Sequence, residues 1–283
     1  MKLGFGRGLL LAVVFLGGGF WQARGGDITV FATASDSSSS IFGTLDLTTG
    51  QFTEIDSLSE HLQSLTAGPG GLLYGSDQNT GDLYSVTTTG VATRFGSAQM
   101  LGALWGLAYA GSSTGFYGVH TYDSEAYFVQ VAPDGNRITT PFNLSATPTY
   151  NSGDLAYGPN GNLYLNSVDS TAQLYQVNVA AGTLTAVGTG LGLPGTHSLA
   201  LGTANGQLYG VDTIQAAGGS SPIDIYTVNT TTGAATATGV HVTGLASGYT
   251  IDTIASVPEP GTLTLGLIGS LFGLIVVRRA RRV

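Results

Sequence analysis

Acidic residues recur at equivalent places in a repeated pattern along this chain. Each follows a short apolar segment that reads as a β-strand, and the five residues are Asp36, Asp77, Asp123, Asp169 and Asp212. Aspartate is a common turn former, which is one interpretation. The other is a ring of carboxylates on one face of the molecule, able to bind Ca²⁺ or to accept hydrogen bonds from sugar hydroxyls.

One of these acidic residues begins a segment with further oxygen donors. In Asp77-Gln-Asn79-Thr-Gly-Asp82 the side chains of Asp77, Asn79 and Asp82 could provide ligands to a cation. The segment lacks the terminal Glu of a complete calcium loop. The sequence therefore predicts at most a weak calcium site at these three residues and no other cofactor.

No established catalytic pattern is found elsewhere. The histidines lie far apart in the sequence: His61, His120, His197 and His241. Cysteine is absent, which excludes a thiol nucleophile. Gly190-Leu-Gly-Leu-Pro-Gly195 matches a dinucleotide-binding pattern, but it lies between two predicted strands rather than before a helix, so it is interpreted as a loop.

The elements that must position these side chains form a repeat. Tyr74, Tyr117, Tyr164 and Tyr209 stand 43, 47 and 45 residues apart, each in a strand-like segment. A preceding strand-like segment is found in each unit: 64–69, 106–110, 154–159 and 198–202. A following one is found at 83–86, 127–131, 174–177 and 225–228, and a glycine turn then precedes a short fourth strand.

Four antiparallel strands in a unit of this length are typical of a β-propeller blade. The N-terminal strands at 28–36, 41–45 and 52–56 lack a first strand, whereas 243–246 continuing through 249–255 lacks a second. The sequence thus predicts an all-β propeller of five four-stranded blades, one of them closed by the C-terminal strand. Six blades are the alternative if 35–40 or 216–222 contains further strands.

The repeated tyrosines have two interpretations. Blades pack face to face, so aromatic side chains on a pleated surface are expected in the core. Stacking against sugar rings is the alternative. Trp105, expected on an inner strand, is likewise assigned to packing.

The N-terminal segment predicts a secretory signal peptide. Lys2 and Arg7 precede an apolar run from Leu9 to Phe20, and small residues at Ala23 and Gly25 place a signal-peptidase cut before Gly26. Residues 1–25 are therefore assigned to the signal, and a retained membrane helix is the alternative.

The C-terminal segment predicts a membrane span. Residues 262–277 carry no charge and would form a helix of about 24 Å, enough for a thin bilayer. The arginines that follow would stay in the cytoplasm; they are Arg278, Arg279, Arg281 and Arg282. The bulk of the protein would then lie outside.

The whole segment 257–283 resembles the PEP-CTERM sorting tail of exported proteins in Gram-negative bacteria. The resemblance is carried by the motif Val257, Pro258, Glu259 and Pro260, the apolar helix and the arginine cluster, in that order. It implies an exosortase-type transpeptidase as a partner, anchoring in the inner membrane, and later processing to the cell surface or the matrix of exopolysaccharide. The same tail is also labelled an ice-binding protein C-terminal domain, but a regular Thr-x-Thr array is lacking.

The net charge of residues 26–256, the region between the two ends, limits the classes of partner that it could bind. Only Arg94 and Arg137 are basic in this region, which carries a net charge of −14, or −15 when Glu259 of the tail is included. Such a charge excludes nucleic acid as a partner. We expect a non-enzymatic envelope or matrix protein that could bind polysaccharide; the alternative is a propeller hydrolase or lactonase with an acidic, metal-binding central channel.

Overall fold

The computed structural model describes residues 28–36, 38–96, 104–122, 125–136, 138–143, 153–167, 172–193, 198–213 and 222–257. Strands make up nearly all of its regular structure, and the helix within these ranges is a single 3₁₀ turn, η1 (Pro69–Gly71). No helix in the described ranges is long and apolar enough to cross a membrane. The predicted signal peptide and the predicted span at 262–277 lie outside those ranges.

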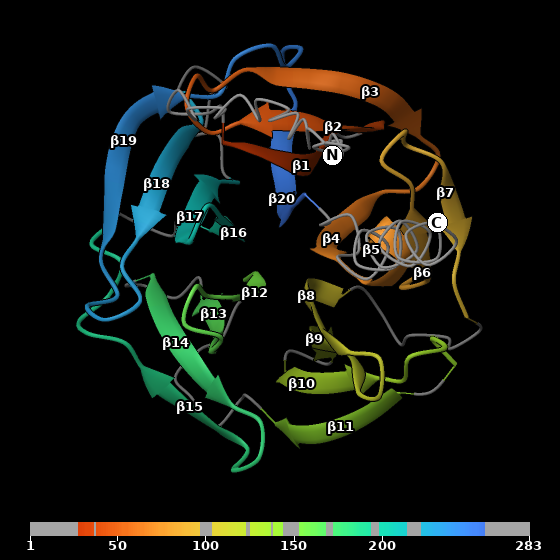
Figure 1. The fold of residues 1–283 in the computed structure, drawn as a ribbon, viewed down its shortest axis with the longest axis vertical. Helices are drawn as coiled ribbons and strands as arrows, with labels where there is room; N and C mark the ends of the chain where they lie inside the picture. The colour runs from red at the N-terminus through yellow and green to blue at the C-terminus, as the bar shows by residue number, and fades with distance from the viewer. Residues whose placement is uncertain are drawn as a thin grey trace, which may run out of the picture.

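Five antiparallel sheets of four strands are arranged around a common axis (Figure 1), which confirms the predicted five-bladed propeller. Blade 1 consists of β20 (Thr250–Ser256), β1 (Thr29–Ser35), β2 (Ser40–Asp46) and β3 (Phe52–Leu58). Blade 2 consists of β4 (Leu62–Ala67), β5 (Leu73–Asp77), β6 (Leu83–Val86) and β7 (Ala92–Arg94).

The remaining blades follow in chain order. Blade 3 consists of β8 (Leu104–Gly111), β9 (Gly115–Tyr122), β10 (Glu125–Val131) and β11 (Ile138–Asn143). Blade 4 consists of β12 (Leu155–Tyr157), β13 (Leu163–Ser167), β14 (Gln173–Asn178) and β15 (Thr183–Ala186). Blade 5 consists of β16 (Leu199–Ala204), β17 (Gln207–Asp212), β18 (Asp224–Val228) and β19 (Ala235–His241).

Blade 1 combines strands from both ends of the described chain. β20 pairs antiparallel with β1, with Val30 opposite Ser256 and Ser35 opposite Thr250. The predicted segment at 243–246 does not belong to this strand. Thr243 instead forms an isolated parallel bridge with Gln51 beside β3, because the chain must first cross the outer side of blade 1 before it reaches the axis.

The first strands of the blades form the innermost ring. β4, β8, β12, β16 and β20 lie beside one another in that order, and β20 returns to β4. This ring is tight enough to require glycine: a Cβ added at Gly106 of β8 would lie 2.6 Å from the backbone nitrogen of Leu155 on β12. The backbones of β8 and β12 are therefore too close at this point for any side chain on Gly106.

The repeated tyrosines lie between blades, as the packing interpretation predicts. Tyr74, Tyr164 and Tyr209 expose 8%, 1% and 8% of their surface. Tyr74 packs on Phe116 of the next blade, with ring centroids 5.0 Å apart. In blade 1 the equivalent position is Phe31, which stands opposite Ala255 in the sheet as Tyr164 stands opposite Ala156. Core packing explains these aromatic residues.

In blade 5 the residues of the first strand are shifted by two positions from those that the correspondence of segments 154–159 and 198–202 predicts. Tyr209 stands opposite Gly202, whereas Tyr164 stands opposite Ala156, so the equivalent of Leu155 is Leu201 and not Leu199. The segment 198–202 resembles 154–158 because both alternate leucine with small residues. Periodicity of two cannot distinguish such a shift.

Replacing Gly106 with alanine tests how tightly the inner ring is packed. We expect Gly106→Ala to lower the free energy of unfolding by about 1–3 kcal/mol, because the new methyl group meets backbone that cannot move aside. Chemical denaturation of the mature protein measures the change. Gly118→Ala is the matched control, since its Cβ would meet the end of the Leu104 side chain at 3.0 Å and backbone only at 3.2 Å, the carbonyl oxygen of Gly106. We expect a smaller loss there, and an equal loss in both variants would contradict the argument.

Candidate functional site

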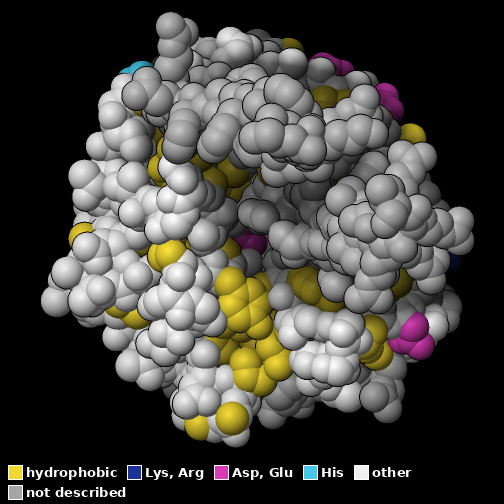
Figure 2. All heavy atoms as spheres, viewed as in Figure 1, with side chains coloured by type: hydrophobic (Ala, Val, Ile, Leu, Met, Phe, Trp, Pro, Cys, Tyr) yellow, Lys and Arg dark blue, Asp and Glu magenta, His cyan; other side chains and the backbone are white. Residues whose placement is uncertain are grey.

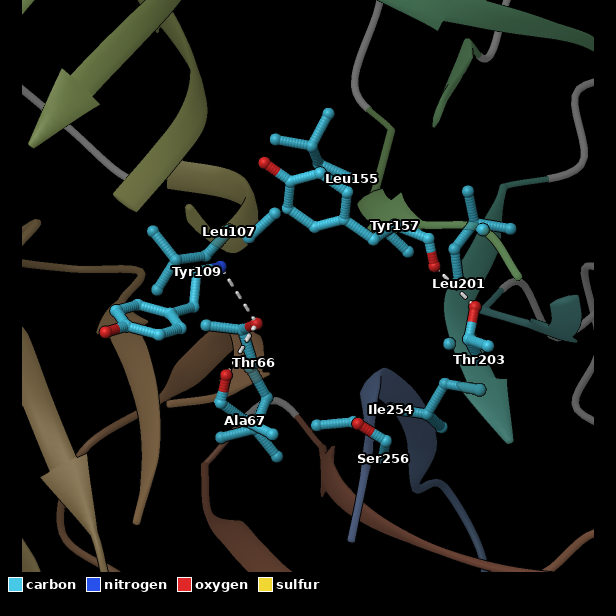
Figure 3. A pocket seen from close by; sticks show the side chains of 16 residues that line it. Thr66, Ala67, Leu107, Tyr109, Leu155, Tyr157, Leu201, Thr203, Ile254 and Ser256 are labelled. Carbon is cyan, nitrogen blue, oxygen red and sulfur yellow. Dashed lines mark hydrogen bonds between the residues drawn. The ribbon is translucent and has the colours of Figure 1, made fainter. Parts of the chain in front are cut away.

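A hollow of about 260 Å³ opens at one end of the central axis, where the inner strands end. All five blades contribute to it, and Figure 3 shows side chains from the five inner strands facing one another across it. The described residues that line it are Leu, Ile, Ala, Gly, Thr, Ser and Tyr, and none of them has a charged side chain. Figure 2 shows hydrophobic side chains gathered around the hollow and an acidic side chain deeper on the axis.

Two tyrosines stand at the rim of this hollow, and the surrounding strands hold them in place. The backbone amide of Tyr109 donates to Thr66 Oγ1 at 3.2 Å, and its ring packs at a tilt on Phe116 with centroids 5.4 Å apart. The hydroxyl of Thr203 donates to the carbonyl of Tyr157 (Figure 3). Burial, reinforced by Tyr117, raises the pKa of Tyr157, so its phenol is neutral. The rim thus offers two aromatic rings, and the ring of Tyr109 is held by Phe116.

Aliphatic side chains line the inner part of the hollow. One comes from each inner strand and each exposes at most 3% of its surface: Leu65, Leu107, Leu155, Leu201 and Ile254. They make the inner part of the hollow apolar. A ligand there would meet aliphatic walls and a rim of hydroxyl groups, above the acidic side chain that Figure 2 shows deeper on the axis.

Next to Leu155 on the chain lies a buried carboxyl group, Asp154, which joins three blades. Its Oδ1 accepts from the Leu155 amide at 2.7 Å, and its Oδ2 accepts from the Leu201 amide at 2.8 Å. The hydroxyl of Thr253 on β20 lies 3.4 Å from the same Oδ2. The group exposes only 5% of its surface. Asp154 thus bridges β12, β16 and β20.

Burial raises the pKa of Asp154 to about 8, against the lowering effect of the amide hydrogen bonds. Loss of hydration disfavours the charged form of a buried carboxyl group. At neutral pH Asp154 is therefore mainly a neutral acid. This makes it a structural bridge and a poor cation ligand.

At the opposite end of the axis, Ser35, His61 and Asp252 meet between blades 1 and 2. Ser35 Oγ lies 2.6 Å from His61 Nε2 and donates to Asp252 Oδ1 at 2.8 Å. The neighbouring carboxylate of Asp252, whose Oδ2 lies 3.7 Å from His61 Nε2, raises the pKa of His61, with support from the charges of Asp77 and Asp36. In a catalytic triad the carboxylate would hold the other ring nitrogen. Here the histidine and the carboxylate both contact Ser35, so the three residues form a polar junction between blades 1 and 2.

The predicted acidic residues mainly form turns where they are described. Asp36 Oδ1 accepts from the amides of Ser38 and Ser39, which lowers the pKa of Asp36 to about 2. Asp77 accepts from the amides of Asn79 and Thr80 and, through its other oxygen, from the His61 amide at 2.7 Å. Asp212 is buried. Asp123 and Asp169 lie outside the described residues.

The predicted calcium ligands are already engaged with protein groups. Asp77 is held by amides, and Asp82 Oδ1 accepts from Arg94 at 2.7 Å. Within the described ranges no group of three or more His, Asp or Glu side chains could hold a metal ion. Calcium binding at Asp77, Asn79 and Asp82 stays a prediction from the sequence, and it would require Asp82 to leave Arg94.

The predicted sorting residues fall at the edge of the described chain. Val257 follows β20 directly and is 46% exposed. Pro258, Glu259 and Pro260 lie outside the described residues, as do Arg278, Arg279, Arg281 and Arg282. The sorting motif also stays a prediction.

The tyrosine-rimmed hollow and Asp154 are the features that the sequence did not identify as a site. Tyr109 and Tyr157 occur in the segments Leu-Ala-Tyr of two first strands, which was the available signal. Asp154 precedes one of these segments, but its partners Leu201 and Thr253 are 47 and 99 residues away.

Comparison with known proteins places the chain by fold only. No family model matches it, and no curated protein does. A protein of unknown function from Bacteroides thetaiotaomicron matches with 12% identity and a TM-score of 0.50 over 72% of this chain and 56% of that one. A chain of a nidogen/laminin complex matches with 15% identity and a TM-score of 0.49, over 72% and 74% of the two chains.

TolB from Acinetobacter baumannii also matches, with 13% identity and a TM-score of 0.48. This chain is covered over 74% of its length and spans about half, 52%, of TolB. At such low identities the likeness shows the propeller fold alone.

Replacing Asp154 with asparagine tests the neutral bridge through its pH dependence. The unfolded carboxyl has a pKa of 3.8 and the folded one about 8, so the stability that this group contributes is complete below pH 3.8 and is lost as the pH rises through 8. We expect the wild-type protein to lose up to about 1.4 kcal/mol per pH unit between those values through this group, and Asp154→Asn to lose much less.

Urea unfolding across this pH range measures both slopes. The variant should also be less stable at low pH, because the asparagine nitrogen would face an amide donor. Glu54→Gln, at an exposed position, serves as the control and should keep the wild-type slope. Identical slopes in wild type and Asp154→Asn would refute a neutral Asp154.

Proposed function

We propose that this protein is an exported, non-enzymatic propeller that binds an uncharged group of a polysaccharide in its axial hollow. The observation that carries the proposal is the lining: two tyrosine rings with threonine and serine hydroxyls around aliphatic side chains, and no charged side chain among the described residues that line it. Sugar rings present apolar faces and hydroxyl edges, and sites that combine aromatic rings with a few polar groups suit them.

The size of the hollow limits what it could hold. At about 260 Å³ it falls just below the range of about 300–1,000 Å³ for pockets that enclose drug-sized ligands. One sugar ring or a chain end fits such a volume. The remainder of a polymer would lie across the rim.

The enzymatic alternative receives no support from this hollow. A hydrolase or lactonase needs a carboxylate, a nucleophile or a metal at the reacting bond. The lining residues include no titratable side chain other than the two tyrosines, and Asp154 is held by amides beside Leu155. A binding role needs none of these groups.

Export and sorting are part of the same proposal. We assign residues 1–25 to a signal peptide and 257–283 to a PEP-CTERM-type tail recognised by an exosortase-type transpeptidase. The limits of the fold support this division, because β1 begins at Thr29, shortly after the predicted cut, and β20 ends at Ser256, directly before the motif. The propeller would thus be held at the inner membrane and then processed to the surface or matrix.

We further propose that β20 closes the propeller. Its pairing with β1 supports this, since without β20 the inner edge of β1 would be unpaired. A chain ending after Gly248 should therefore aggregate or lose cooperative unfolding, whereas a chain ending after Val257 should remain monomeric. Sedimentation and thermal unfolding compare the two, and a stable monomer without β20 would contradict closure.

Binding to polysaccharide is tested on the mature protein with the exopolysaccharide of the producing cell and with neutral oligosaccharides derived from it. We expect Tyr157→Ala to weaken binding about two- to tenfold, because a stacked ring contributes about 0.5–1.5 kcal/mol beyond the area it buries. Titration calorimetry measures the change. Tyr84→Ala on β6 is the control, since Tyr84 does not line the hollow; equal affinities of both variants would exclude the hollow.

Processing of the tail is tested by intact mass. The protein released from the cell surface should lack Arg278 to Val283, because a transpeptidase acting near the motif removes the helix and the arginine cluster with it. A released form that retains these residues would exclude processing. A strain without the transpeptidase provides the control and should keep the full-length mature chain in its membrane.

A further inference from the structure

Both ends of the propeller leave it at the face that contains the hollow. Ser256, the last residue of β20, lines the hollow itself. Val30 near the start of β1 stands opposite Ser256 in the sheet, so the chain enters at this face as well. Any tail attached to Val257 therefore begins at the rim of the hollow.

The connection from this rim to the predicted span is short. Six residue steps join Ser256 to Thr262 and reach at most about 22 Å when fully extended. A compact body of about 230 residues is about 45 Å across. The tether starts near the axis, where β20 lies (Figure 1), so it is no longer than the radius of the body.

This comparison restricts the orientation of an anchored propeller. To turn the hollow away from the bilayer, the tether would have to cross from the axis to the rim and then pass the thickness of the blades. That path is longer than about 22 Å. The opposite face, with the connection between β3 and β4 and the Ser35–His61 junction, must point outward.

We infer that the hollow faces the membrane while the tail anchors the protein, and that removal of the tail opens it to polymers. This inference rests on the proposed anchor and on the proposed binding site, and it adds a regulatory step: the protein binds polysaccharide in the hollow only after processing. Cleavage then acts both as release and as exposure of the site.

The absence of cysteine from the sequence allows a direct test. Ser113→Cys lies in the exposed turn between β8 and β9 on the hollow face, and Ser59→Cys lies in the exposed connection between β3 and β4 on the opposite face. The full chain carrying either cysteine is placed in liposomes and reacted with a maleimide bearing a large polyethylene glycol chain. We expect Ser113→Cys to react severalfold more slowly than Ser59→Cys.

Lengthening the tether is the decisive control. Inserting about 20 Gly and Ser residues between Val257 and Pro258 adds roughly 25 Å of mean reach and should make the two cysteines react at equal rates in a chain that is still anchored. A small maleimide should label both cysteines equally in every form, which shows that both positions are accessible in the folded protein.

The possible failures are distinguishable. Equal rates in the unmodified chain, with the protein floating together with the liposomes, would overturn the orientation and leave the anchor intact. A chain that does not float with liposomes would overturn the anchor and the orientation together. The weakening of polysaccharide binding by Tyr157→Ala is measured on the mature protein without its tail, so its outcome is independent of both results.

Discussion

The propeller depends on satisfying the inner edges of its five first strands. Each of these strands pairs on one side only, so its other edge directs backbone N–H and C=O groups toward the axis, where they must find partners. Asp154 accepts two such amides, Thr66 accepts a third, and Thr203 donates to a carbonyl. These polar contacts, together with the aliphatic walls of the hollow, fix the ring without any disulfide.

The blade architecture could be predicted because it is local. Each hairpin brings together residues that are close in sequence, and the glycine turns and alternating apolar residues mark it directly. The register of β16 and the place of 243–246 could not be predicted, since both depend on contacts between distant strands. The register of Gly202 is shown by its pairing with Tyr209, and the position of Thr243 is shown by its bridge to Gln51 on the outer side of blade 1.

The candidate site was less predictable than the fold. Aspartates that follow the second strands were conspicuous in the sequence, yet Asp36 and Asp77 hold their own turns. The hollow depends on residues such as Tyr157 and Thr203, which meet only when blades 4 and 5 are side by side. A repeat identifies equivalent positions within blades, but it does not reveal which of them converge on the axis.

The shared blade has a consequence for the order of folding. Ser35 and Asp252 are in contact although 217 residues separate them in sequence. On the proposed export route the N-terminal strands would emerge first and β20 last, so blade 1 would keep an unpaired edge while the other four blades are produced. The inner edge of β1 would therefore be the last part of the propeller to find its partner, and a delay in making β20 would leave that edge open to pairing with another chain.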